Sequence, residues 1–271
     1  MSASDDPNSP DSRDAVARVG ETRWLALDGG REAGRGDACR RPDGRMFVSV
    51  DAWESPVFDR LAAAIVADLP APLHAVVDAD DPDTVAAWQR AGLVIGRRER
   101  EYVVPTDPRV TGLDAVRAPE GVTIVPLGQA REAPLRALDR AIRAEVEAGV
   151  GWRTMPAEVL PRPEGVTVVD PAKYAVADAD GRYVGLVRVA PVTRRPRIGL
   201  IAVLAEQQRR GIARALLAEV LGSLHDAGTE TVWAEADESN IAARTLMERV
   251  NARCSGGILE MVSATEKSQC D

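Results

Sequence analysis

The sequence predicts an α/β fold built on a mixed sheet. Short apolar or alternating runs of strand length are interleaved with longer runs in which apolar residues recur at helical spacing. In the C-terminal half the predicted elements follow the order β-α-β-β-β-α-β-α-β, which places helices on both faces of a sheet. The 271 residues, 45% of them hydrophobic, suffice for one large domain or two modest ones, and no run of about 18 apolar residues predicts a membrane span.

The C-terminal half carries the clearer pattern. A strand at 122–129 precedes a helix at 133–149, whose apolar positions are Leu135, Leu138, Ile142 and Val146. The following elements are a hairpin at 173–192, a strand at 197–205, a helix within 207–224, a strand at 231–237, a helix at 240–250 and a strand at 256–263. Asp180-Gly181 marks the hairpin turn, because this pair tolerates positive φ.

The N-terminal half repeats the later part of this order. The predicted elements are strands at 22–28 and 45–52, a helix at 57–69, a strand at 73–80, a helix at 83–92 and a strand at 93–104. Either the chain contains an internal duplication, or two α/β domains share a common order. From Pro, Gly and polar composition we expect a disordered tail at 1–20, domains at 21–106 and 122–265, and a linker at 107–121.

Charge and cysteine content narrow the function classes. The formal charge of −8 and the isoelectric point near 5.0 argue against a nucleic-acid partner and are compatible with a cationic substrate. Three cysteines without CxxC spacing and two histidines are too few for a typical zinc site, so we expect no metal. The N-terminal segment lacks the apolar core of a signal peptide. We therefore expect a cytoplasmic protein, monomeric or homodimeric, without a membrane partner.

The stretch QQRRGIARALLAEVLGSL, residues 207–224, places a glycine among donors just before an amphipathic helix. Unpaired N–H groups and the helix dipole at such a start bind phosphate oxygens. Gly211 allows close approach of the backbone, and Arg209 and Arg210 add planar donors. The chain has neither GxxxxGK[ST] nor GxGxxG at this turn. The pattern therefore predicts a pyrophosphate-binding turn; the alternative is an ordinary helix start with solvated arginines.

The same turn resembles the [QR]xxGx[GA] signature of the GNAT superfamily of acyl-CoA N-acyltransferases, here Gln-Arg-Arg-Gly-Ile-Ala at 208–213. IAVLAE upstream matches the strand that pairs with pantetheine in that family, and ESNIAARTLMERV downstream resembles its NxxAxxLYxxxGF helix. The resemblance covers 122–262 and, weakly, 22–105, where WQRAGLVIG is similar to the family's terminal WxxxGF. It implies a GNAT-like fold of two tandem domains, the N-terminal one incomplete and the C-terminal one catalytic, with acetyl-CoA as cosubstrate.

The resemblance also implies the coenzyme-binding residues. These are Val203, Ala205, Gln208, Arg209, Arg210, Gly211, Ile212, Ala213, Arg214, Asn240 and Met247. Met247 departs from the family, since many members have at this position a Tyr that protonates the leaving thiolate, and a thioether cannot donate a proton. A thiolate with a pKa not far from that of cysteine can leave without full protonation. The N-terminal copy has WESPVFDR instead of the signature, so we expect it not to bind coenzyme A.

Two sets of residues are candidates for the chemistry. Glu235 and Asp237 alternate with alanines on the predicted strand 231–237 and share one face, where either can act as general base; alternatively they are solvated or helix-capping acids. Ser239 is the expected N-cap of the next helix. The resemblance places the acceptor near the loop after the first helix, with Glu145, Glu147, Trp152 and Arg153 as candidates; the alternative for Trp152 is that it caps a hydrophobic cluster.

These observations lead to an expected function. The resemblance implies an N-acetyltransferase that moves an acetyl group from acetyl-CoA to a primary amine of a small molecule. Because no Ser-His or Cys-His arrangement is visible, we expect direct transfer in a ternary complex. The alternatives are a non-catalytic acyl-CoA-binding regulatory protein and an acetyltransferase acting on a protein or peptide N-terminus. The duplication also suggests a two-copy enzyme that makes a small thiol or acts on an antibiotic.

Overall fold

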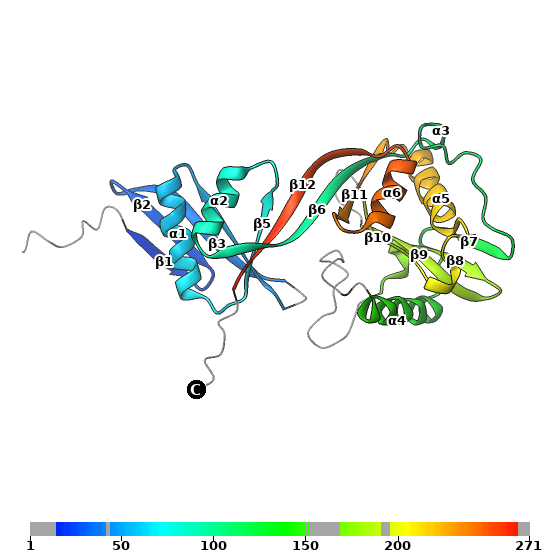
Figure 1. Cartoon of the computed structure of the whole chain (residues 1–271), viewed down its shortest axis with the longest axis horizontal. Helices are drawn as coiled ribbons and strands as arrows, with labels where there is room; N and C mark the ends of the chain where they lie inside the picture. The colour runs from blue at the N-terminus through cyan, green and yellow to red at the C-terminus, as the bar shows by residue number, and fades with distance from the viewer. Residues whose placement is uncertain (1–14, 42–43, 150, 152–168, 191–195, 265–271) are drawn as a thin grey trace, which may run out of the picture. The chain divides into compact units, whose positions relative to one another are not determined.

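The computed structural model describes residues 15–41, 44–149, 151, 169–190 and 196–264 (Figure 1). The chain divides into two compact units. The N-terminal unit comprises Met1–Gly96 and Leu259–Asp271, and the C-terminal unit comprises Arg97–Ile258. Two long strands, β6 (Leu93–Pro105) and β12 (Arg253–Ser263), each contribute residues to both units.

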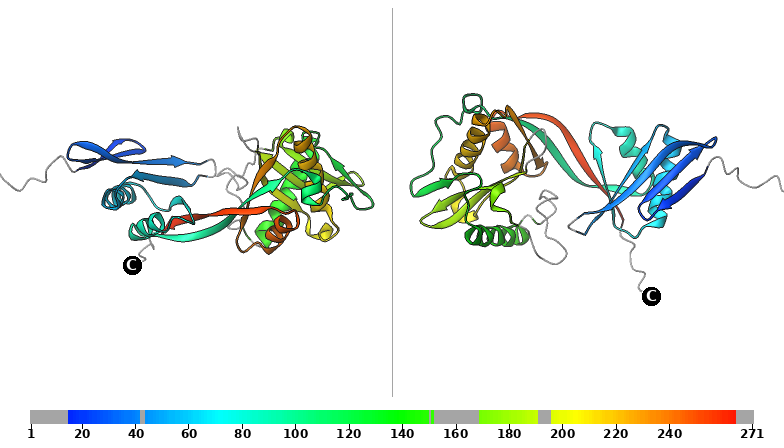
Figure 2. Two further views of the ribbon diagram at one scale, coloured as in Figure 1. Left: turned by 90° about the horizontal axis from the view of Figure 1, so that it is seen from above. Right: turned by 180° about the vertical axis from the view of Figure 1, so that it is seen from behind.

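The N-terminal unit has helices on one face of its strands (Figure 2). Its other elements are β1 (Val16–Gly20), β2 (Arg23–Asp28), β3 (Arg31–Arg40), β4 (Met46–Ala52), α1 (Ser55–Asp68), β5 (Leu73–Asp78) and α2 (Pro82–Arg90). The strand order is β1-β2-β3-β4-β5-β12-β6, in which β1 to β4 pair antiparallel and β4 pairs parallel with β5. Trp24 and Ala26 on β2 are fully buried while Arg23 is exposed, the alternation of a sheet covered on one face.

The C-terminal unit has helices on both faces of its sheet, with α4 on one side and α5 and α6 on the other (Figure 1). Its elements are α3 (Pro108–Thr111), β7 (Val122–Val125), α4 (Glu132–Ala148), β8 (Tyr174–Ala179), β9 (Arg182–Ala190), β10 (Arg197–Val203), α5 (Ile212–Asp226), β11 (Thr231–Asp237) and α6 (Ile241–Arg249). The strand order is β12-β6-β11-β10-β9-β8-β7. β10 and β11 are parallel, whereas β7 to β10 form antiparallel pairs.

The two units repeat one arrangement, which confirms the predicted duplication of the fold. β2-β3-β4-α1-β5-α2-β6 corresponds to β8-β9-β10-α5-β11-α6-β12. In each repeat a glycine lets the helix pack closely: a Cβ added to Gly36 would lie 2.5 Å from Cδ1 of Ile65, and one added to Gly185 would lie 3.2 Å from Cγ2 of Ile212. The N-terminal repeat is incomplete, because β1 joins β2 through a short turn where α4 separates β7 from β8.

The final strands of the two repeats are exchanged in the hydrogen-bonding order. β11 pairs antiparallel with β6, from Thr231 opposite Pro105 to Asp237 opposite Glu99. β12 lies between β5 and β6. The strand beside β11 in the C-terminal unit is therefore the end of the N-terminal repeat, and it brings side chains from residues 97–105 into this unit.

This exchange moves the boundaries that the sequence predicts. The units meet within β6 and β12 rather than at the predicted linker 107–121, part of which forms α3. The predicted tail 1–20 is too long, because residues 16–20 form β1. Strand β3 is absent from the sequence-based prediction, since REAGRGDACR combines charges and glycines and lacks the β-branched residues typical of a strand.

We expect Gly34→Ala to lower the free energy of unfolding by about 1–3 kcal/mol, the usual range for overpacking. The added Cβ would lie 2.9 Å from both the Asp51 carbonyl oxygen and the Ala52 Cβ. Gly222→Ala in α5 is the control, because its Cβ meets nothing within 4 Å and alanine favours a helix interior. Urea unfolding followed by circular dichroism measures both; equal stability of the two variants would contradict the close packing of β3.

Candidate functional site

The central feature of the C-terminal unit is the short pairing between β10 and β11. Only Arg197 with Trp233 and Ile198 with Ala234 are paired, although β10 continues to Val203 and β11 to Asp237. The backbone groups of the later residues are therefore not used in pairing between these two strands. A ligand can bind to strand edges that part in this way.

The end of β10 presents backbone groups toward this gap. The Leu204 N–H donates to the Val184 carbonyl on β9 (2.9 Å), so the backbone groups of the alternate residues Val203 and Ala205 point the other way. Side chains occupy them here: Gln208 Nε2 donates to the Val203 carbonyl (3.0 Å), and the Ala205 N–H donates to the Glu145 carboxylate (3.1 Å). Both contacts involve exposed side chains that a ligand can displace.

The helix after β10 begins at a turn suited to an anion. Gly211 is the N-cap residue of α5, with φ of 93° and no side chain to cap the first turn. Arg209 also has a positive φ, 64°, and its side chain is exposed. Within the described residues the backbone N–H groups of 212–214 find no acceptor. The first turn of α5 also contains no acidic residue, so the positive end of the helix dipole is not offset within this turn.

Three arginines, Arg209, Arg210 and Arg214, lie close to this turn in the sequence. The buried Nε of Arg214 has no hydrogen-bond partner among the described residues. Arg210 donates to the Gln207 side chain and to the Glu120 carbonyl (3.3 Å). A buried donor without an acceptor is unfavourable unless a ligand satisfies it. The turn thus fits the pyrophosphate of coenzyme A, which accepts hydrogen bonds from both backbone N–H and guanidinium groups.

The corresponding turn of the N-terminal repeat is unsuited to phosphate. β4 and β5 also pair over two residues only, so the parting of the strands is retained. However, Glu54 is the N-cap residue of α1, and Pro56 in the first turn has no N–H. The connection is also shorter: α1 begins at Ser55, three positions after β4 ends at Ala52, whereas α5 begins at Ile212, nine positions after β10 ends at Val203. Carboxylate repulsion and the lost donors disfavour an anion at this turn.

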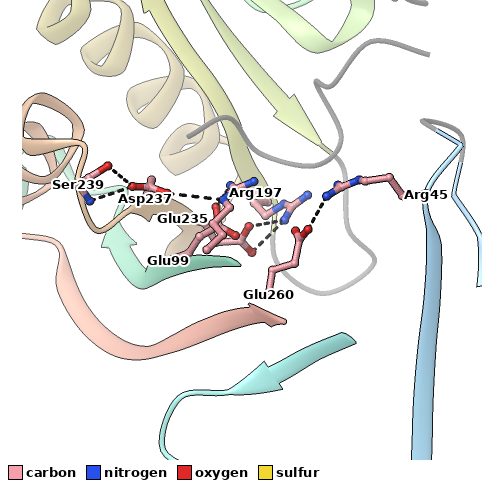
Figure 3. A network of polar contacts seen from close by, with 8 residues as sticks. Arg45, Glu99, Arg197, Glu235, Asp237, Ser239 and Glu260 are labelled. Atoms are coloured by element: carbon pink, nitrogen blue, oxygen red, sulfur yellow. Dashed lines mark hydrogen bonds and ion pairs between the residues drawn. The ribbon is translucent and has the colours of Figure 1, made fainter. Parts of the chain in front are cut away.

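Side chains at the start of β4 and β5 contact one another and the neighbouring strand β12. The last paired residues, Phe47 and His74, are buried and stack with ring centroids 5.2 Å apart. The carboxylate of Glu260 on β12 accepts from Arg45 (2.5 Å; Figure 3). The same carboxylate lies 3.0 Å from His74 Nδ1. These contacts tie β12 to β4 and β5 within the N-terminal unit.

The start of α6 differs from the sequence prediction in one detail. Asn240, not Ser239, caps the helix: its Oδ1 accepts from the Ala243 N–H (3.0 Å). The Ser239 backbone N–H and hydroxyl both donate to Asp237 Oδ1. Met247 is 3% exposed and belongs to the hydrophobic core, where its thioether contributes packing.

Glu235 and Asp237 share one face of β11, opposite the buried Ala234 and Ala236 (Figure 3). Arg197 Nη1 donates to both oxygens of Glu235, at 2.9 and 2.8 Å. Asp237 Oδ2 lies 3.8 Å from Nε of Arg97. Both candidate bases are therefore held by arginines, and Asp237 also shapes the turn before α6 through Ser239.

Glu99 on β6 completes this network, and the sequence analysis does not identify it. It lies opposite Asp237 and forms an ion pair with Arg97. Burial of its carboxyl raises the pKa of Glu99 from 4.5 to about 7; Arg97 opposes this shift, and the charges of Glu235 and Asp237 add to it. Three carboxylates thus share two guanidinium groups.

We name the side chains of Arg97, Glu99, Arg197, Glu235 and Asp237 the acidic network. Glu99 precedes its partners on β11 by more than 130 positions and lies in the N-terminal repeat, so sequence proximity could not reveal it. The sequence signal that could have identified Glu99 is the alternation of Arg97, Glu99 and Glu101 on a predicted strand, which places these three side chains on one face.

The predicted acceptor residues are placed only in part. Glu145 lies on α4 and contacts the end of β10, as described above. Glu147 is exposed on the same helix. Trp152 and Arg153 lie outside the described residues. A hollow of about 480 Å³ is found on β7 and β8, but its charged lining residues, Asp178 and Asp180, would repel phosphate.

The raised pKa of Glu99 predicts how stability depends on pH. Between pH 4.5 and about 7 the folded protein retains a proton that the unfolded chain has released, so this residue makes stability fall as pH rises through that window. Glu99→Gln removes the effect. We expect the variant to gain stability relative to the wild type, by up to roughly 3 kcal/mol, between pH 4.5 and 8. Urea unfolding at several pH values measures this difference; a difference independent of pH would contradict the raised pKa.

Comparisons with known proteins agree with this geometry. Residues 146–251 match the sequence model of the acetyltransferase (GNAT) family. A search of curated protein sequences gives no match. Within the described residues, none of the helices is long and apolar enough to cross a membrane.

Solved structures resemble the chain over most of its length. A GCN5-related N-acetyltransferase from Sphaerobacter thermophilus is 18% identical, with a TM-score of 0.61 over 91% of this chain and 82% of its own. A tandem GNAT protein from the clavulanic acid biosynthesis pathway is 15% identical, with a TM-score of 0.61 over 91% and 83%. A GCN5-related N-acetyltransferase from Kribbella flavida is 14% identical, with a TM-score of 0.58 over 92% and 89%. The chain therefore has a tandem GNAT fold, and residues 146–251 form a domain of the acetyltransferase (GNAT) family.

Proposed function

We propose that this protein is an N-acetyltransferase that transfers the acetyl group of acetyl-CoA directly to a primary amine of a small molecule. The observation that carries the proposal is the position of the α5 turn. Its free N–H groups and the buried Arg214 donor lie just beyond β10, the strand that parts from β11. The match of this region to the acetyltransferase (GNAT) family supports acyl-CoA as the donor.

Each part of the site has a distinct task in this proposal. The first turn of α5, with Arg209, Arg210 and Arg214, holds the pyrophosphate. The backbone groups of Val203 and Ala205 bind the pantetheine arm once Gln208 and Glu145 release them, and Asn240 caps the helix on the opposite side of the gap. Acetyl-CoA, when bound, supplies the thioester carbonyl that the amine attacks.

In this proposal the acidic network binds the acceptor amine. Glu235 and Asp237 come one and three positions after Ala234, the last residue of β11 that pairs with β10, so they lie on the part of β11 that has separated from β10. In this proposal the carboxylates on this face of β11 attract an ammonium ion, and one of them accepts its proton. No covalent enzyme intermediate is required, because a free amine attacks a thioester directly.

Met247 favours the alternative of a regulatory protein that binds acyl-CoA without turnover. Its buried thioether cannot protonate a leaving thiolate, and a protein that binds acyl-CoA without turnover would not need this function. Acetylation of a peptide N-terminus is a second alternative, since an α-amino group is also a primary amine.

We expect acetyl-CoA to bind at one site per chain, in the C-terminal unit. Gly211→Asp should weaken binding at least 10-fold, because it places a carboxylate at the pyrophosphate. Gly228→Asp is a matched control: Gly228 follows the same helix, also has positive φ (81°), and a Cβ there also meets nothing within 4 Å. Calorimetric titration measures both. Two equal sites per chain, or equal affinities of the two variants, would place the coenzyme site elsewhere.

We expect the wild-type protein to release coenzyme A in the presence of a small primary amine. The panel should include polyamines, aminoglycosides, amino acids and peptides with free N-termini, with free thiol detected by a colorimetric reagent. Turnover with a small amine supports the proposal, and turnover with peptides alone assigns the activity to protein N-termini. Tight binding of acetyl-CoA without turnover on any amine would favour the regulatory alternative.

A further inference from the structure

We propose that Glu145 is an autoinhibitory group: its carboxylate occupies the Ala205 N–H and must leave before the pantetheine arm of acetyl-CoA binds there. This inference rests on the proposed function, which assigns the edge of β10 to the coenzyme, and it adds a determinant of coenzyme affinity. It follows from the hydrogen bonds at this edge and from the position of Glu145 on α4.

The edge of β10 offers one donor and one acceptor to a ligand. The Ala205 N–H is the donor and the Val203 carbonyl is the acceptor, because the intervening Leu204 N–H points toward β9. The amide groups of a pantetheine arm carry both a carbonyl and an N–H, so they can pair with both backbone groups. In the structure Glu145 and Gln208 make these two hydrogen bonds instead.

Glu145 approaches the Ala205 N–H with both oxygens of its carboxylate. Oε1 and Oε2 lie 3.2 and 3.1 Å from the Ala205 nitrogen, so the two oxygens share one donor. A hydrogen bond to an ionised carboxylate is stronger than one to a neutral amide carbonyl, which is the acceptor that pantetheine offers. The carboxylate is therefore a competitor of the coenzyme at this group, and its charge also repels the coenzyme phosphates.

The stability of α4 does not explain a carboxylate at this position. Glu145 and Glu147 both lie in the last turn of α4, which has no basic residue. A negative charge at the C-terminal end of a helix is unfavourable, because the helix dipole is negative there. Within the described part of the chain, the Ala205 N–H is the one hydrogen-bond or ion-pair partner of Glu145. The contact with the edge of β10 is thus what distinguishes this side chain.

The contact between Glu145 and Ala205 can open through the side chain alone. Both residues are exposed, so the carboxylate can turn into solvent by a change of rotamer. Gln208 differs, because it also belongs to the turn proposed to bind the pyrophosphate, and its replacement would change more than one contact. Replacement of Glu145 therefore tests the occupied N–H most directly.

The test is a calorimetric titration of acetyl-CoA, without an amine, into the wild type and Glu145→Ala. We expect Glu145→Ala to bind acetyl-CoA roughly 3- to 10-fold more tightly, which corresponds to an N–H that the carboxylate occupies in about 70–90% of wild-type molecules. Glu145→Gln keeps an acceptor oxygen but loses the charge, so its affinity should lie between those of the other two proteins.

Two controls separate this effect from the loss of a negative charge as such. Glu147→Ala removes the same charge two positions along α4, where the side chain is exposed, and its affinity for acetyl-CoA should stay within about 2-fold of the wild type. Adenosine 3′,5′-bisphosphate carries phosphates of the coenzyme but lacks the pantetheine arm, so its affinity should also change by less than about 2-fold in every variant. Circular dichroism checks that each variant is folded.

The outcomes separate this inference from the proposed function. A wild type that binds acetyl-CoA as tightly as Glu145→Ala, or more tightly, contradicts the inference and leaves the function intact. An equal gain in Glu147→Ala, or with the bisphosphate, would assign the effect to charge alone and would also overturn it. If neither the wild type nor Glu145→Ala binds acetyl-CoA, the proposed function fails together with the inference. Binding by Glu145→Ala alone would be the strongest form of the expected result.

Discussion

The candidate site depends on the early end of the pairing between β10 and β11. Parallel strands in a sheet normally continue to exchange hydrogen bonds, and two strands that part must have other partners to remain ordered. Here β10 stays paired with β9 as far as Val203, and β11 stays paired with β6 over its whole length. Each strand is held from its outer side, so the inner edges can remain open to a ligand.

This constraint explains why the functional groups lie where they do. α5 begins just after β10, so its unpaired N–H groups and Arg214 are near one side of the gap. Glu235 and Asp237 follow the last paired residue of β11, on the opposite side. Gly185 on β9 allows α5 to pack closely on the sheet, which fixes the start of the helix relative to β10. The proposed anion site and the proposed acceptor site therefore depend on the same local geometry.

In the N-terminal repeat the two parallel strands also separate early, but the start of the following helix does not offer the same hydrogen-bond donors. β4 and β5 also separate after two pairs, but Glu54 and Pro56 replace the donors at the start of α1. Its remaining polar groups, Arg45, His74 and Glu260, bind one another. Its functional contribution is a strand: β6 is the outer partner of β11 and carries Glu99 and Arg97.

The sequence by itself determined the features that depend on neighbouring residues. Helix periodicity, the Asp180-Gly181 turn and the Gly211 turn are local, so the elements around them were predicted to within a few positions. The alternation on β11 also placed Glu235 and Asp237 on one face. Only the tertiary structure decided the exchange of β6 and β12, the contact of Glu145 with Ala205, and the grouping of Glu99 with carboxylates more than 130 positions away. Strand partners are chosen by long-range pairing and burial, which leave no local pattern. The raised proton affinity of Glu99 comes first from its burial and then from the charges that this pairing brings beside it.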